Sequence, residues 1–326
     1  MPRRFNINKT ILSVCITALL VLWLFKVIEI QDVTRLFSAI SPAWLLIGLA
    51  CYVSAYVMRT LRFQVLLSKQ TRFQDIFLIT SIHNLAVRIL PNPLGEFVFI
   101  RQTKEKGIAY AEGTAAVIMA RVLDFLALAI ICGISLLLVS FDQFQKGALF
   151  IAITLTMALA GFAFIYVMAS KKRNVLRWII LKFKKDTDKS SLTRKIESLE
   201  EAFSGISDYR VYAPASLFSF AVWISMFASY YFFFLALDIA IMPLAVATAG
   251  GVQVVANSIP NIAGLGVMEA GWALGFSILG IMNPTLLAGA FGIDLLTLIG
   301  TIALGLISLF VKYTPRLCRA YLIWKQ

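Results

Sequence analysis

The chain has 326 residues, of which 60% are hydrophobic and 14% are charged, whereas soluble domains average about 45–50% and about 25%. Apolar runs long enough to cross a bilayer recur along it without the alternation of barrel strands, so we expect an all-α, polytopic helical membrane protein. The formal net charge of +13 does not indicate nucleic-acid binding, because the Lys and Arg residues lie mainly in short loops and helix flanks.

The first apolar run, 11–30, follows a basic start with Arg3, Arg4 and Lys9, as in a signal peptide. No small-residue cleavage site follows it, so we expect an uncleaved first helix. Later runs without interruption predict full spans, and runs broken by Pro, Gly and Asn predict interrupted segments. The expected spans are 11–30, 43–67, 114–139, 148–169, 213–237 and 285–311, and the interrupted stretches are 76–100 and 243–281.

Both interrupted stretches break at the same dipeptide, Pro-Asn, at positions 91–92 and 260–261. Each break is rich in Gly, Pro and Asn, and an acidic residue follows it, Glu96 in the first case and Glu269 in the second. Interrupted apolar segments at corresponding positions of two halves are the best sequence indication of a transport site in a membrane protein.

The distribution of basic residues predicts how the chain is oriented. If the N-terminus is cytoplasmic, most of the 30 Lys and Arg residues fall in inside segments, which favours an inner (cell) membrane protein with both termini in the cytoplasm. The stretch 76–100 then begins and ends inside and is too short for two crossings of about 20 residues each, so we expect a re-entrant hairpin. The stretch 243–281 has both ends outside and is long enough for two tilted spans.

When the sequence is aligned with itself at an offset of 169 residues, which places position 91 on position 260, two halves come into register. Repeat one covers about 43–140 and repeat two about 212–311, within a single transmembrane domain. Span 43–67 would run inward and span 213–237 outward, so the repeat is expected to be inverted, with a substrate site near the midplane and alternating access. Chance matching of apolar helices is the alternative. Between the repeats, the basic cytoplasmic loop 171–211 suits binding to anionic lipid.

Charged side chains within the expected membrane zone point to this site. A charge at a helix centre costs about 2.5–3.5 kcal/mol, so these groups must pair, become neutral or line a wet cavity. Arg121 and Asp124 are three residues apart on one helix face and can pair, as a site or only as a clamp between helices. Asp294 lacks a local Arg, so Arg88 or Arg121 is its candidate partner.

Other polar residues complete the predicted substrate site. Asparagines at the breaks can bind a headgroup or only satisfy open backbone groups. Arg59, Arg62 and Arg101 are expected at the inner mouth of the first hairpin, where they would attract phosphate oxygens or only set the topology. The predicted substrate-binding residues are Arg59, Arg62, Arg88, Asn92, Glu96, Arg101, Arg121, Asp124, Asn257, Asn261, Glu269 and Asp294.

Neither metal nor catalytic chemistry is indicated by the sequence. His83 is the one histidine and the four cysteines are isolated, so we expect no metal site and no cofactor. His83 is expected to be a core or pore-lining residue. Because no catalytic motif is present, we expect that the protein is not an enzyme.

Three segments, NLAVRILPNPLGEFVFIRQ, ARVLDFLAL and NSIPNIAGLGVMEAG, resemble the lysylphosphatidylglycerol synthase transmembrane region family of flippase-like membrane proteins. The resemblance covers about residues 40–310. Gly95, Glu96 and Arg101 match the family's Gly-Glu and the Arg that follows it. Arg121 and Asp124 match the family's Glu-Arg-Val-x-Asp pattern.

Two charges of the family pattern are replaced, a Glu by Ala120 and, in the second break, an Arg by Met268. The family's best understood members also carry a soluble aminoacyl-transferase domain, which the sequence to Gln326 lacks, so we expect no aminoacyl-lipid synthesis. The resemblance implies a flippase-like transporter of a phospholipid or a polyprenyl-phosphate-linked lipid. The alternatives are an ion-coupled small-solute transporter and a membrane component of lipid-linked sugar or aminoacyl-lipid assembly.

Overall fold

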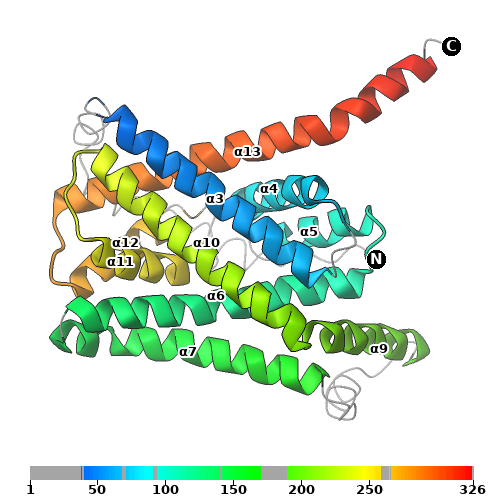
Figure 1. Cartoon of the computed structure of the whole chain (residues 1–326), viewed down its shortest axis with the longest axis horizontal. Coiled ribbons are helices and arrows are strands. Elements are labelled where there is room, and N and C mark those ends of the chain that lie inside the picture. The colour runs from blue at the N-terminus through cyan, green and yellow to red at the C-terminus, as the bar shows by residue number, and fades with distance from the viewer. Residues whose placement is uncertain are drawn as a thin grey trace.

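All regular secondary structure in the described part of the chain is α-helical, which confirms the predicted fold class (Figure 1). The structure is a computed structural model. The first predicted span, both Pro-Asn breaks with Asn92 and Asn261, and the loop segment 170–188 lie outside the described residues. The structure describes Ser38, residues 40–67, 71–90, 94–139, 141–169 and 189–257, Gly264 and residues 266–324.

Among the described residues, four helices are long and apolar enough to cross a membrane. In the last of them, the apolar part is Pro284–Thr314. They confirm the spans predicted at 43–67, 114–139, 213–237 and 285–311, so the chain is a multi-pass membrane protein. These helices are α3 (Pro42–Leu66), α6 (Tyr110–Val139), α10 (Tyr209–Ala236) and α13 (Pro284–Trp324).

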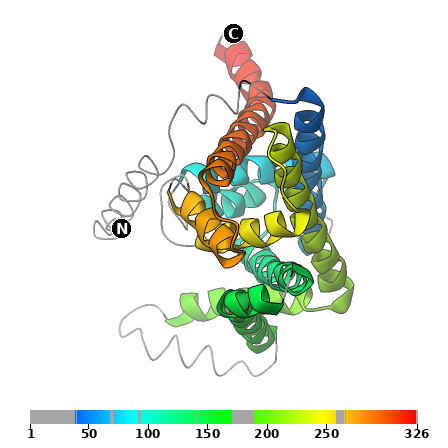
Figure 2. The same cartoon turned by 90° about the vertical axis from the view of Figure 1, so that its left-hand side faces the viewer.

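The predicted span 148–169 falls within a further helix, α7 (Phe141–Ala169). It packs along α6 at the flank of the bundle opposite α13, as Figures 1 and 2 both show. A short helix from the predicted cytoplasmic loop, α9 (Lys189–Ile206), packs against α6 and α7. Its Phe203 and Ile206 are buried, so this part of the loop is attached to the helical bundle.

The longest helix contact joins α3 and α10, which belong to different halves of the sequence (Figure 1). Trp44 stacks on Phe232 with ring centroids 5.7 Å apart. A Cβ atom at Gly48 would lie 2.5 Å from the Phe233 ring, so glycine is what permits this close approach. The other two long helices, α6 and α13, both contact α10, and α6 also contacts α3.

Each interrupted stretch forms two short helices. The first contains α4 (Phe73–Ile89) and α5 (Leu94–Lys104), and the second contains α11 (Pro243–Ala256) and α12 (Val267–Ile278). The longest has 17 residues, or about 25 Å, which is less than the hydrocarbon thickness of about 30 Å. The interruption of both stretches is therefore confirmed. The helices of the second stretch have 14 and 12 residues, so they are too short for the two tilted spans that its length allowed.

Glycine brings the two helices of each hairpin into contact at their backbones. A Cβ atom at Gly95 would lie 2.5 Å from the Cα atom of Val87, and one at Gly271 would lie 2.5 Å from the Cα atom of Gln253. Both halves thus have the order long, short, short, long helix, and the hairpins lie toward opposite ends of the bundle (Figure 1). These features agree with an inverted repeat, which itself stays a prediction.

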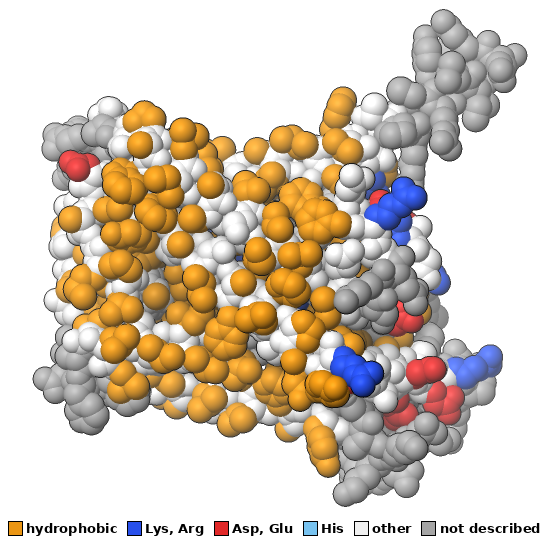
Figure 3. Space-filling model, in the orientation of Figure 1, with side chains coloured by type: hydrophobic (Ala, Val, Ile, Leu, Met, Phe, Trp, Pro, Cys, Tyr) orange, Lys and Arg blue, Asp and Glu red, His pale blue; other side chains and the backbone are white. Residues whose placement is uncertain are grey.

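The surface separates apolar flanks from a charged end. On the face in Figure 3, hydrophobic side chains cover the sides of the long helices. Charged side chains gather toward the right-hand end, where Figure 1 places α5 and α9. This distribution is what a lipid-embedded bundle with one charged aqueous end requires.

Candidate functional site

A cavity of about 390 Å³ lies between the helices of the two halves. Both hairpins and all four long helices contribute to its lining, from Tyr52 on α3 to Thr301 on α13. The structure brings most of the predicted site residues together there, whereas Arg101 is exposed and Glu269 and Asp294 lie outside the lining. The predicted residues that line the cavity are Arg59, Arg62, Arg88, Glu96, Arg121, Asp124 and Asn257.

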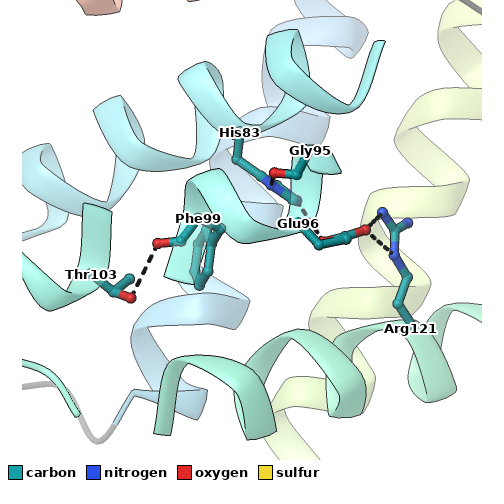
Figure 4. Close-up of polar contacts among 6 residues, drawn as sticks. All are labelled: His83, Gly95, Glu96, Phe99, Thr103 and Arg121. Carbon is teal, nitrogen blue, oxygen red and sulfur yellow. Dashed lines mark hydrogen bonds and ion pairs between the residues drawn. The ribbon is translucent and has the colours of Figure 1, made fainter. Parts of the chain in front are cut away.

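Glu96, in the first turn of α5, is held by two side chains from other helices (Figure 4). Arg121 on α6 donates from Nε to Glu96 Oε1 at 3.0 Å and also donates from Nη2. His83 on α4 places Nε2 3.4 Å from Glu96 Oε2. Its Nδ1 lies 3.3 Å from the carbonyl oxygen of Gly95, so His83 contacts both residues of the Gly-Glu pair.

His83 is thus a cavity-lining residue, as expected, and it also positions Glu96, which the sequence did not predict. It is buried, and the rings of Phe63 and Phe99 lie beside it with centroids 6.3 and 5.3 Å away. The described parts of α4 and α5 meet across the first break because of contacts such as these.

Asp124 on α6 is held by a second, more deeply buried set of side chains. Arg62 on α3 forms an ion pair with Asp124 Oδ1, and Trp223 Nε1 on α10 donates to the same oxygen at 2.9 Å. Arg62 also donates to Ser219 Oγ at 3.0 Å and is only 3% exposed. These contacts connect three long helices at one point.

The predicted pairing of Arg121 with Asp124 along one helix is therefore not what the structure shows. Arg121 pairs with Glu96 and Asp124 pairs with Arg62, so each side chain of α6 reaches a different helix. Helix packing brings a group of opposite charge on a neighbouring helix into hydrogen-bonding contact with each residue, so the two do not pair along α6. Arg121 and Asp124 each connect α6 to another helix, which agrees with the alternative that they clamp helices together.

Two further arginines line the cavity without a carboxylate oxygen within 4 Å in the described residues. The Arg59 guanidinium lies 5.9 Å from the ring centroid of Tyr56 and 6.0 Å from that of Trp223. Arg88 donates to the sulfur of Met268 and, at 3.4 Å, to the backbone oxygen of Asp294. Of the two candidate partners predicted for Asp294, Arg88 contacts it, through the backbone oxygen and not the carboxylate, whereas Arg121 pairs with Glu96.

The lining is consequently positive, with four arginines and two carboxylates. Both carboxylates already have arginine partners, so the excess of two positive charges belongs to Arg59 and Arg88. Guanidinium groups are weakly hydrated and bind phosphate or carboxylate oxygens in a fork. The cavity is therefore suited to an anionic group.

Hydroxyl groups on α3 and α13 form a further part of the wall, which the sequence did not predict. Tyr52 Oη lies 2.7 Å from Thr301 Oγ1, 3.1 Å from Tyr56 Oη and 3.1 Å from the carbonyl oxygen of Thr297, to which it donates. A signal was available, because Tyr52, Tyr56 and Arg59 have the i, i+4, i+7 spacing of one helix face. Trp223 and Ser219 share such a spacing on α10.

The composition of the lining bears on metals and on the two altered family positions. No group of three or more His, Cys, Asp or Glu side chains that could hold a metal ion occurs in the described residues.

Ala120 and Met268, which stand where the family that the motifs resemble has a Glu and an Arg, both line the cavity. One replacement removes a negative charge and the other a positive charge, so together they leave the net charge of the site unchanged.

A comparison with protein families agrees with the motifs. The family model described as Lysylphosphatidylglycerol synthase TM region matches residues 10–305, and every residue of the cavity lining lies within that range. A comparison with curated proteins finds no match.

Proposed function

The chain belongs to the lysylphosphatidylglycerol synthase TM region family, and we propose that it is a flippase-like transporter of an anionic membrane lipid. Its substrate would be a phospholipid or a polyprenyl-phosphate-linked lipid. The proposed activity moves the lipid between leaflets and makes or breaks no covalent bond. We place the protein in the cell (inner) membrane with both termini in the cytoplasm, as the basic residues predict.

The excess of arginine over carboxylate in the cavity is the observation that carries this proposal. A guanidinium at membrane depth without a carboxylate in direct contact is costly, so Arg59 and Arg88 are expected to contact an anionic group during the working cycle. A lipid phosphate supplies that partner. The hydroxyl groups of Tyr52 and Thr301 offer further hydrogen bonds to the headgroup.

The size of the cavity supports entry of the headgroup alone. Its volume of about 390 Å³ lies toward the lower end of the range for small-molecule sites, about 300–1,000 Å³. Long acyl or prenyl chains would have to remain in the bilayer. Exposed apolar side chains along α3 and α13, such as Leu46, Ile299 and Phe310, are suited to contact with such chains.

Movement of the halves against each other would carry the headgroup across. The pairs Glu96–Arg121 and Asp124–Arg62 connect helices that meet at the cavity, so rearranging these contacts is a candidate step in opening one mouth or the other. The proposed inverted repeat provides two equivalent arrangements, one open to each side.

The experiment that tests this proposal measures lipid movement in proteoliposomes. Fluorescent short-chain phosphatidylglycerol is placed in both leaflets, and dithionite added outside quenches the label as it reaches the outer leaflet. Arg59→Gln and Arg88→Gln each remove one cavity charge, and Arg101→Gln removes an exposed one. Losing one charge-assisted hydrogen bond, about 1.5–3 kcal/mol, predicts a rate about 10–100-fold lower for the cavity variants only.

Two results would oppose the proposal. Wild-type liposomes that lose fluorescence no faster than protein-free liposomes would show that the lipid is not moved. Equal slowing by Arg101→Gln and the cavity variants would show that general charge matters and the cavity does not.

A small anionic solute is the second candidate substrate, because the cavity volume would hold one completely. Uptake of a radiolabelled organic phosphate into wild-type vesicles, with no movement of labelled lipid, would favour this ion-coupled solute transporter over the flippase.

A further inference from the structure

Two buried acids lie beside the cavity without the partners that Glu96 and Asp124 have. Glu269, in the first turn of α12, is 1% exposed, and Asp294 on α13 is 4% exposed. Glu269 Oε2 and both carboxyl oxygens of Asp294 have no hydrogen-bond partner in the part of the chain that the structure describes. Arg88 connects the segments that carry them, because it donates to the sulfur of Met268, the residue before Glu269, and to the backbone oxygen of Asp294.

The side chains around this pair cannot neutralise two negative charges. Arg88 from α4 interacts electrostatically with both acids but places no nitrogen within 4 Å of either carboxylate. The indole N–H of Trp272 on α12 has no hydrogen-bond partner among the described residues, and its ring packs edge to face against Tyr230 from α10 with centroids 5.6 Å apart. Backbone N–H groups at the start of α12 stabilise one oxygen of Glu269.

A buried amide lies on the neighbouring helix α11, whose backbone at Gln253 packs against Gly271 of α12. Gln253 is 1% exposed, lines the cavity and has no hydrogen-bond partner for Oε1 in the described helices. Two ionised carboxylates enclosed by these groups would repel each other and would lack solvation. Together with one arginine they have a net negative charge, and a bound proton removes it.

We propose that Glu269 and Asp294 form a proton-binding site that is linked to the anion site through Arg88. The inference rests on the proposed function, which it extends by naming the coupling ion. Arg88 is in a position to serve both sites, since it lines the cavity and contacts the backbone oxygen of Asp294. An anion that draws the guanidinium toward the cavity leaves the carboxyl pair with less positive charge nearby, and a proton then binds.

This linkage has a direction. Because binding free energies are reciprocal, a proton on the acid pair raises the affinity of the cavity for the anion, and the anion raises the affinity of the pair for the proton. A monoanionic headgroup and one proton would therefore move together and in the same direction. The combined movement is electrically neutral, so a membrane potential alone should not drive it.

The first test measures lipid accumulation in proteoliposomes under an imposed gradient of one pH unit. With one proton per phosphatidylglycerol, wild type should shift the labelled lipid toward the alkaline side up to about tenfold, and a potassium–valinomycin potential should not. The double variant Glu269→Gln/Asp294→Asn, which has neither acid to bind the proton, should let the lipid equilibrate without accumulation. Asp238→Asn is the matched control, because Asp238 is exposed and has φ of 58°, a backbone conformation that Asn also adopts.

The second test needs no transport. Purified protein in weakly buffered detergent receives short-chain phosphatidylglycerol, and a pH indicator records proton uptake. The uptake should approach one proton per bound lipid in wild type and Asp238→Asn and vanish in Glu269→Gln/Asp294→Asn. Lipid binding or movement without proton uptake and without accumulation would overturn the inference but leave the flippase proposal intact. A wild-type protein that neither binds nor moves the lipid would overturn both.

Discussion

Replacing Asp124 by Asn should destabilise the protein more than any other single change in its polar cavity wall. The substitution keeps the shape of the side chain and an oxygen for Trp223, but it removes the charge that balances Arg62. Arg62 is 3% exposed, so its guanidinium would remain buried without a counter-ion. Breaking a buried ion pair from one side costs about 3–5 kcal/mol.

The other ion pair of the cavity provides the comparison. The side chain of Arg121 is 48% exposed, so after Glu96→Gln its guanidinium can be hydrated, and the cost should be near the value of about 0–1 kcal/mol for exposed pairs. Unfolding of each variant by sodium dodecyl sulfate in mixed micelles, followed by the circular dichroism of the helices, gives the two free-energy differences. Both variants lose one negative charge, so the comparison isolates burial.

A double variant separates the value of the pair from the cost of leaving one charge behind. Arg62→Met combined with Asp124→Leu should recover most of the stability lost in Asp124→Asn, because a buried pair replaced by apolar side chains leaves no uncompensated charge. Equal losses in Asp124→Asn and Glu96→Gln would refute the reasoning. So would a double variant as unstable as the single one.

Two other predictions concern packing and positioning. Gly95→Ala should separate α4 from α5 and abolish lipid movement, because its Cβ atom would lie 2.5 Å from the Cα atom of Val87. Lipid movement at the wild-type rate in this variant would contradict the prediction. Gly205→Ala, whose Cβ atom would meet nothing within 4 Å, should leave the free energy of unfolding unchanged or raise it by up to about 1 kcal/mol. Trp223→Phe removes the indole donor of Asp124 and should lower the free energy of unfolding by about 1.5–3 kcal/mol in the same micelle assay, whereas an unchanged value would show that the hydrogen bond contributes nothing.

The helices that follow from length and hydropathy could be predicted from the sequence. Spans such as 43–67 and 213–237 are confirmed. A run of about 20 apolar residues is stable in a membrane as a helix, because the helix satisfies all backbone polar groups within the segment. The broken stretches were also predictable, since Gly and Pro interrupt helices. The backbone contact of Gly95 with Val87 depends on how the helices approach each other, which no local pattern contains.

The residues that line the cavity were easier to predict than the ion pairs that they form. Charges at membrane depth must face the protein interior, and this physical constraint places Glu96, Arg121 and Asp124 at one site. Their partners depend on helix rotation, so Arg62 and Trp223 could not be assigned to Asp124 from spacing. Aromatic residues within apolar runs look like packing residues, so the sequence did not indicate that the Tyr52 hydroxyl and the Trp223 indole form hydrogen bonds.

Arg101 shows how a helix separates neighbouring motif residues. It follows Glu96 by five positions, which is a rotation of about 140° around an α-helix. The structure accordingly places Glu96 in the cavity wall and Arg101 on the exposed surface near the charged end of the bundle. The predicted role of Arg101 in attracting lipid to the inner mouth is separate from the cavity account, in which Arg101→Gln is the control.

Native mass spectrometry of the purified protein tests most directly whether the cavity binds a lipid phosphate. Wild type and Arg101→Gln should each retain one anionic phospholipid or polyprenyl-phosphate-linked lipid, and the double variant Arg59→Gln/Arg88→Gln should lose it. A wild-type protein that carries no such lipid, or a double variant that retains it as well as wild type does, would contradict the account.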